Sequence, residues 1–184
     1  MNFKFLILGP QKRDLHKIID AIETKNNNFV ICKKFTNDIT YKDTENVNGF
    51  YYLDNQTLNT SLKNNALLYA VTNEQYTTGV TVDDFYNSDI LYMSIAEFNN
   101  ISSNFISNYK DNIVIVWLDT KHHIDNKLLK KDIYEVNYLV NKINEFNYNY
   151  IYLLDESPEY ISDIINEYFY GDESVRQQIL DENN

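Results

Sequence analysis

The sequence predicts a three-layer α/β domain, in which helices flank a parallel β-sheet and a small antiparallel lobe is inserted. Short apolar runs typical of strands alternate with amphipathic segments of helical period along the chain. Residues 112–118 (NIVIVWL) are almost continuously apolar and rich in β-branched side chains, as in a central parallel strand covered on both faces. Shorter alternating segments within residues 66–82 indicate the inserted strands.

The first half of the chain opens with a strand, a turn and a helix. Residues 3–8 (FKFLIL) are apolar and β-prone, and Gly9-Pro10 ends them in a turn. Apolar residues then recur at helical spacing over residues 15–22. The same patterns predict further strands at residues 29–35, 49–53, 66–71, 75–82 and 90–95, and further helices at 57–64, 82–85 and 101–109.

The second half continues the alternation after the strand at residues 112–118. A long helical period runs over residues 125–146, a strand follows at 150–154, and a helix at 160–168. We therefore expect one domain over residues 1–170, with the inserted lobe at about 36–82. Residues 171–184 are acidic and are expected to form a tail or a short helix.

Composition excludes several classes of function. The 184 residues carry a net charge of −11, which disfavours binding to nucleic acid because phosphate backbones are repelled. The one cysteine, Cys32, has no intramolecular partner, which fits a reducing compartment. No run approaches the roughly 20 apolar residues of a membrane span, and the N-terminal apolar run is too short for a signal peptide. We expect a cytoplasmic protein that contacts neither membrane nor nucleic acid.

Several strings, taken in order, resemble the guanylate kinase family of nucleoside monophosphate kinases. LILGP at residues 6–10 resembles the strand and Gly-Pro that open its phosphate loop. FT at 35–36 followed by NGFYY at 48–52, LLYA at 67–70 and YTTGV at 76–80 resemble its monophosphate lobe, and FNYNYI at 146–151 resembles the segment before its last strand. The resemblance spans about residues 3–169 and implies a P-loop-kinase-like sheet.

The phosphate loop that this resemblance implies departs from the pattern G-x-x-x-x-G-K-[ST]. In that motif backbone N–H groups and the lysine hold the phosphates, and the hydroxyl holds Mg²⁺. The corresponding stretch, residues 9–17, reads GPQKRDLHK, so that an aspartate, a leucine and a histidine stand where the second glycine, the lysine and the serine are expected. The residues of this degenerate loop are Gly9, Pro10, Lys12, Arg13 and Lys17, and the three cations among them can still attract an anion.

Other family positions depart as well. Phosphoryl transfer relies on cationic clamps, but the chain has two arginines, Arg13 and Arg176, and neither lies in the expected monophosphate loop or lid. The guanine-reading glutamate of the family falls on Leu68, and its acidic pair at the end of a strand falls on Tyr92 and Ser94. These losses predict that the domain is not a kinase and that it has no catalytic residues.

A residual monophosphate pocket is the part of the site that the resemblance keeps best. Tyr52 and Tyr76 match family positions that contact the monophosphate, and Thr36 and Thr78 lie beside them in the resembling strings. In a chain with 16 tyrosines such matches also arise without function, so that packing is an alternative role for both tyrosines.

Other reactive side chains do not combine into a site. The adjacent His122 and His123, near Asp119 and Asp125, point to opposite sides of an extended chain and lack a second cluster of ligands, so we expect no metal. Cys32 lies in a predicted strand and is interpreted as a small buried apolar residue. The pair at residues 83–84 (DD) is typical of the first turn of a helix.

Tyrosines crowd the C-terminal third of the chain and suggest an interaction surface, because tyrosine is enriched at protein interfaces. A gene rich in A and T would also produce them. They are Tyr134, Tyr138, Tyr148, Tyr150, Tyr152, Tyr160, Tyr168 and Tyr170.

The prediction is a catalytically inactive guanylate-kinase-like module for protein interaction or assembly, without a cofactor, whose partners are proteins in a homo- or hetero-oligomer. A phage virion or accessory protein is one setting that fits the composition. Two alternatives stay open: a divergent nucleoside or deoxynucleoside monophosphate kinase that uses Lys12, Arg13 or Lys17, and a regulator that binds a monophosphate around Tyr52 and Tyr76 without transferring phosphate.

Overall fold

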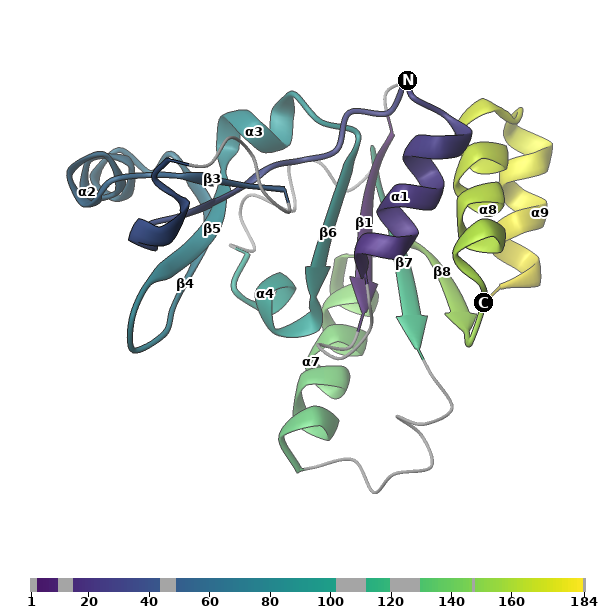
Figure 1. Ribbon diagram of the computed structural model, residues 1–184. Helices are drawn as coiled ribbons and strands as arrows, with labels where there is room; N and C mark the ends of the chain where they lie inside the picture. The colour runs from purple at the N-terminus through teal and green to yellow at the C-terminus, as the bar shows by residue number, and fades with distance from the viewer. Residues whose placement is uncertain are drawn as a thin grey trace.

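Two β-sheets lie side by side in the molecule (Figure 1). The computed structural model describes residues 3–9, 15–43, 49–101, 112–119, 130–146 and 148–183. Its central sheet is parallel, in the order β6-β1-β7-β8. The strands are β1 (Lys4–Gly9), β6 (Ile90–Ser94), β7 (Ile113–Asp119) and β8 (Asn149–Leu154). The predicted α/β class with a parallel sheet is confirmed.

The central sheet lies in the interior of the molecule, because successive side chains of its strands point alternately into two apolar cores. Phe5 and Ile7 belong to one core cluster, while Leu6 and Leu8 belong to the other, and all four are at most 1% exposed. Successive side chains of a strand point to opposite faces, so that an uninterrupted apolar run needs cover on both sides. The predicted three layers follow directly from this run.

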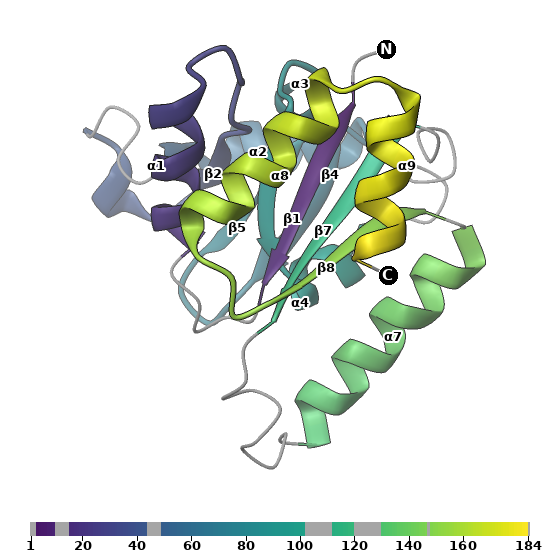
Figure 2. The same ribbon diagram turned by 90° about the vertical axis from the view of Figure 1, so that its right-hand side faces the viewer.

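Different helices cover the two faces. On one face lie α1 (Leu15–Lys25), α8 (Pro158–Tyr170) and α9 (Glu173–Glu182), and Figure 2 shows α8 and α9 crossing this face. The other face is covered by α4 (Ile95–Asn99) and α7 (Lys130–Phe146). In the segment predicted as a tail or short helix, α9 places Ile179, 4% exposed, in the first core.

The inserted sheet has the order β3-β2-β5-β4 and is mixed rather than wholly antiparallel. The β2–β3 pair is parallel, because the chain between those strands returns to the same end before β3 begins. The β2–β5 and β4–β5 pairs are antiparallel, as predicted. The elements are β2 (Lys34–Thr36), η1 (Ile39–Tyr41), β3 (Phe50–Tyr52), α2 (Asn55–Lys63), β4 (Leu67–Thr72), β5 (Thr77–Thr81) and α3 (Val82–Tyr86).

The chain passes from the central sheet to the inserted sheet just before β2. Ile31 forms an isolated parallel bridge with Ile90 of β6, and the N–H of Cys32 donates to the Ile90 carbonyl at 2.7 Å. The predicted strand at residues 29–35 is therefore split between two sheets and only its last part is a regular strand. The predicted helix at residues 101–109 lies almost entirely outside the described residues.

Candidate functional site

The carboxyl ends of the central strands are the natural place for a ligand in an α/β fold. At this edge Gly9, the last residue of β1, pairs with Ser94, the last residue of β6. The inserted sheet stands beside this edge, next to β6 and α4 (Figure 1). A carboxylate from α4 and a lysine from the inserted sheet meet there.

Glu97 reaches this edge because Ser94 and Glu97 form a capping box at the start of α4. The Glu97 N–H donates to Ser94 Oγ at 3.2 Å, and the Ser94 N–H donates to Glu97 Oε2 at 2.7 Å. The two residues thereby satisfy backbone donors that the first turn of a helix leaves open. Glu97 was not predicted as a site residue from the sequence, although the spacing S-x-x-E directly after an apolar strand indicates a capping box at this position.

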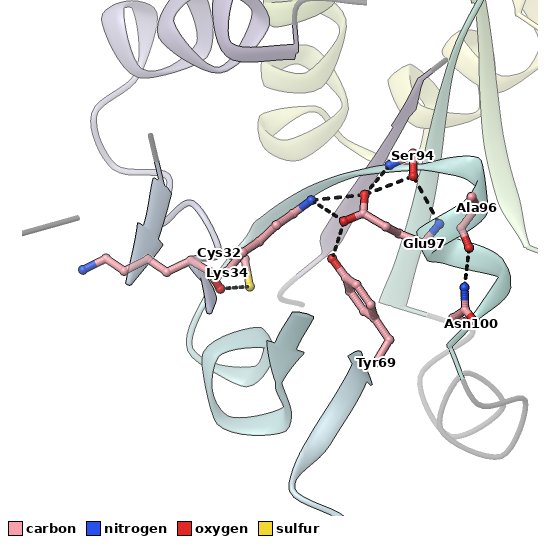
Figure 3. A network of polar contacts seen from close by, with 8 residues as sticks. Cys32, Lys34, Tyr69, Ser94, Ala96, Glu97 and Asn100 are labelled. Atoms are coloured by element: carbon pink, nitrogen blue, oxygen red, sulfur yellow. Dashed lines mark hydrogen bonds and ion pairs between the residues drawn. The ribbon is translucent and has the colours of Figure 1, made fainter. Parts of the chain in front are cut away.

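Lys34 of β2 forms an ion pair with Glu97 at this place (Figure 3). Its Nζ lies 3.0 Å from Glu97 Oε1 and 3.2 Å from Oε2, and it stands over the ring of Tyr92, 4.8 Å from the centroid. Lys34 is 4% exposed. The burial of a lysine is unfavourable unless a charge is paired with it, and Glu97 supplies that charge.

Tyr69 of β4 completes what we call the Lys34–Glu97 network: Lys34, Tyr69, Ser94 and Glu97. The Tyr69 hydroxyl donates to Glu97 Oε1 at 3.2 Å, and the Ser94 hydroxyl donates to Oε2 at 3.1 Å. A carboxylate offers about four lone-pair positions. Those of Glu97 are taken up by Lys34, Tyr69 and Ser94.

The network shifts the pKa values of its members. Burial raises the pKa of Glu97, but the charge of Lys34 and the hydrogen bonds from Ser94 outweigh burial, so that the pKa lies below its ordinary value. Burial raises the pKa of Tyr69 well above its ordinary value, and the negative charge of Glu97 raises it further. At neutral pH Glu97 is therefore a carboxylate and Tyr69 a neutral phenol.

The predicted residual monophosphate residues come together in part. Thr36 pairs with Tyr52 on one side and with Thr78 on the other, so that these three side chains lie in one row across the inserted sheet. Lys34, two residues before Thr36, shares this face and reaches Glu97. Tyr76 lies just before β5, outside that row, and is partly buried.

The predicted phosphate-loop residues are described only at their two ends. Gly9 is buried at the end of β1, and Lys17 is exposed on α1. Pro10, Lys12 and Arg13 lie outside the described residues.

Arg176 lies at the opposite end of the central sheet from the candidate site. Its guanidinium stacks over the ring of Phe3, 4.7 Å from the centroid, and its Nε donates to the Tyr168 carbonyl at 3.0 Å. Phe3 precedes β1, whereas Gly9 ends it, and six residues of strand span roughly 20 Å. Arg176 therefore stabilises the packing of α9 and lies far from the Lys34–Glu97 network.

The structure resolves the interpretations of Cys32 and of the aspartate pair at residues 83–84, but not that of the two histidines. Cys32 is 1% exposed, and burial raises the pKa of its thiol to about 11, as expected of a small buried residue. Asp83 and Asp84 stand in the first turn of α3, as predicted. His122, His123 and Asp125 lie outside the described residues, and within the described part no three potential metal ligands gather.

The predicted surface of tyrosines is only partly a surface. Tyr148 and Tyr168 are 5% and 1% exposed, because both belong to the apolar cores, so that assigning them to a surface was wrong. Tyr138, Tyr160 and Tyr170 are exposed. The side chain of Tyr134 is outside the described part of the molecule.

The parallel sheet, the inserted mixed sheet and the site between them define a guanylate-kinase-like α/β fold. Among solved structures, the chain is similar to guanylate kinase from Anaplasma phagocytophilum, with a TM-score of 0.58 over 97% of this chain and 86% of that one. The sequence identity is 13%, so that the likeness shows the fold and not the activity. No protein-family model matches the sequence, and no curated protein matches it. No helix among the described residues has both the length and the apolar character that crossing a membrane requires.

Proposed function

We propose that this chain is a guanylate-kinase-like domain that does not transfer phosphate and that serves as a protein-interaction or structural module. The observation that carries the proposal is the Lys34–Glu97 network. Among the described residues, Lys34 and the Glu97 carboxylate beside the end of β6 are bound to each other, and Tyr69 and Ser94 also donate to this carboxylate. In this arrangement both oxygens of Glu97 already accept hydrogen bonds, and the charge of Lys34 is paired with that carboxylate.

The arginines support the same conclusion. A transferring phosphoryl group needs cations that hold its oxygens, and arginine is the side chain that does this with two parallel hydrogen bonds. Of the two arginines in the chain, Arg176 is engaged by Phe3 and Tyr168 at the far end of the sheet. Arg13 is the one arginine of residues 9–17, a stretch in which Leu15 replaces the lysine of the family motif.

The residue at the position of the family's guanine-reading glutamate also supports the loss of nucleotide binding. Leu68, which stands where the family resemblance places a glutamate, is 4% exposed and belongs to the second core cluster. A buried leucine cannot accept hydrogen bonds from a base. Its packing role accounts for its burial without a nucleotide.

The role in protein interaction is the broader part of the proposal. Tyr138, Tyr160 and Tyr170 are exposed by 39%, 42% and 61%, and they lie on the helices that cover the two faces of the central sheet. Exposed tyrosines supply contact area with little loss of side-chain entropy. We name a phage virion or accessory protein as the setting because the composition is rich in Asn, Ile, Lys and Tyr. A gene rich in A and T encodes these residues often, and phage genes share that bias.

One observation favours a second candidate, a divergent monophosphate kinase or a monophosphate-binding regulator. The row of Tyr52, Thr36 and Thr78 lies on the same face of the inserted sheet as Lys34. Thr36 is 2% exposed, so the hydroxyl groups of this row that can reach phosphate oxygens are those of the partly exposed Tyr52 and Thr78. This candidate needs Lys12, Arg13 or Lys17 to replace the missing lysine of the loop.

A nucleotide assay separates these functions. The purified chain is incubated with ATP, Mg²⁺ and each of several monophosphates (GMP, dGMP, AMP, dTMP), and ADP release is followed in a coupled assay beside an active guanylate kinase. Our proposal expects no release above the blank and no Mg²⁺-dependent thermal shift with millimolar ATP or GMP. Release with any monophosphate supports the divergent kinase. A shift with GMP alone supports the regulator.

The interaction part is tested by light scattering after size exclusion, across a range of protein concentrations. Self-association that is weakened by Tyr160→Ser and Tyr170→Ser, with unchanged circular dichroism, supports a tyrosine-dependent interface between copies. If the parent and the variants are monomers at every concentration, the homo-oligomer is excluded, and the interaction proposal then requires a different protein as the partner.

A further inference from the structure

The Lys34–Glu97 network joins the two sheets of the molecule. Lys34 and Tyr69 come from β2 and β4 of the inserted sheet, whereas Ser94 and Glu97 come from the end of β6 and the start of α4 in the central domain. All bonds of Lys34 and Tyr69 to Glu97 therefore cross from one part of the molecule to the other (Figure 3).

We propose that the Lys34–Glu97 pair is a latch that holds the inserted sheet against the central domain without any ligand. This inference goes beyond the proposed loss of phosphoryl transfer, since it concerns the position of the inserted sheet and stands on contacts within the chain. In a fold whose ligand would lie between two parts, a bound ligand bridges them. Here the protein supplies both halves of the bridge itself.

The strength of the latch comes from its burial. The Lys34 side chain is 6% exposed and the Glu97 side chain 20%, so that water screens the pair less than it screens an ion pair on the surface. If the inserted sheet moved away, the ammonium and the carboxylate would separate, and each would have to be solvated anew. Charge-assisted hydrogen bonds are about twice as strong as neutral ones.

The surroundings of the pair reinforce the same contact. Lys34 Nζ lies over the ring of Tyr92 in β6, 4.8 Å from its centroid, which adds a second interaction between the sheets. Gly49, just before β3, has a φ of +74°, and a Cβ at this position would lie 3.1 Å from the Tyr92 hydroxyl. The start of β3 therefore also packs closely on β6.

Hydrogen exchange followed by mass spectrometry tests the latch on the full chain. Glu97→Gln is the informative variant, because glutamine at this position of a capping box still accepts from Ser94 while the charge is lost. The matched control is Glu74→Gln, the same chemical change at an exposed residue of the inserted sheet. Peptides from residues 50–81 report on the inserted sheet, and peptides from 113–119 and 149–154 report on the central sheet.

The latch predicts that Glu97→Gln accelerates exchange in residues 50–81 by about tenfold, as expected for the loss of one charge-assisted hydrogen bond, with no change in β7 and β8. Glu74→Gln leaves both regions unchanged. Unchanged exchange in residues 50–81 overturns the inference, and so does an equal acceleration of both sheets, because the pair would then only stabilise one folding unit. Should Glu97→Gln not fold, Tyr69→Phe tests the same expectation with a smaller, selective acceleration.

The failure of the latch and the failure of the proposed function give different results. Nucleotide turnover in the coupled assay contradicts the non-catalytic proposal but leaves the exchange pattern of Glu97→Gln free to support the latch. An absence of turnover together with unchanged exchange keeps the non-catalytic proposal and removes the latch.

Discussion

Gly79 of β5 lies against the ring of Phe35 in the neighbouring strand β2. A Cβ at position 79 would stand 2.8 Å from Phe35 Cζ and 2.2 Å from the Tyr69 carbonyl oxygen. Phe35 pairs directly with Gly79 and is fully buried, so that its ring has no room to move away. A glycine in a strand marks such a close approach.

Gly79→Ala is therefore expected to destabilise the protein by about 1–3 kcal/mol, because overpacking displaces the Phe35 ring or the β4–β5 pairing. Urea unfolding followed by circular dichroism measures the change. Thr72→Ser, an exposed change in the adjoining strand β4 that keeps the hydroxyl contact with Thr77, is the control and should stay within about 0.5 kcal/mol of the parent. A Gly79→Ala protein as stable as the parent would show that the inserted sheet is loosely packed.

Acid weakens the protein through Glu97. Its pKa is lowered in the folded state, so that the unfolded state binds a proton first as the pH falls, and the stabilisation is present above about pH 4.5 and lost below it. Between pH 6 and pH 3 the parent should lose free energy of unfolding relative to Glu97→Gln, by at most about 2 kcal/mol, because one proton changes stability by about 1.4 kcal/mol per pH unit. The measurement is a series of urea titrations of both proteins. A constant difference across this range would contradict the ion pair.

Alkali weakens the protein through its buried phenols. Burial, followed by the charge of Glu97, raises the pKa of Tyr92 to about 12, so that the folded state keeps a proton which the unfolded state loses near pH 10. The free energy of unfolding should fall between pH 10 and pH 12, by about 1.4 kcal/mol per pH unit from Tyr92 alone. Tyr92→Phe keeps the ring beneath Lys34, and its stability should decline less steeply over the same interval. Equal slopes for the two proteins would count against this origin.

Much of the fold could be predicted from the sequence because it rests on local patterns. The apolar run of β1 and the helical period of α1 and α8 appear where they were expected, and Phe5 and Ile7 of β1 fill the same core cluster as the two helices. The parallel β2–β3 pair could not be predicted, since strand direction depends on how residues far apart in the chain meet. Which tyrosines of the C-terminal third are exposed could not be predicted either, because it depends on how their helices and strands pack against the core.

The candidate site was only partly visible in the sequence. Thr36, Tyr52 and Thr78 were singled out through the family resemblance, and strand pairing brings them into one row. Lys34 and Glu97, 63 residues apart, were not recognised, because each looks like a solvent-exposed charge until the inserted sheet folds against α4. An ion pair between two parts of a fold produces no periodic pattern in the sequence. The one local sign of it is the S-x-x-E spacing of the capping box that includes Glu97.

Cys32 should resist thiol reagents in the folded protein. Its side chain is 1% exposed, and its pKa of about 11 leaves about a thousandth of it as thiolate at pH 8. A chromogenic disulfide reagent should react with the native chain at least about a hundredfold more slowly than with the chain in concentrated urea. Comparable rates would mean that the edge of the central sheet at residues 31–32 opens readily.

We predict that Arg176 stabilises the fold and does not bind phosphate. Arg176→Lys removes the planar stacking over Phe3 and the Nε hydrogen bond to Tyr168, and should lower the free energy of unfolding by about 1 kcal/mol. Because Arg176 lies at the amino end of β1, the change should leave any nucleotide-induced thermal shift as it is in the parent. The matched change Arg13→Lys lies in the expected phosphate loop instead. An unchanged free energy of unfolding in Arg176→Lys, or an equal loss in Arg13→Lys, would contradict the structural role of Arg176.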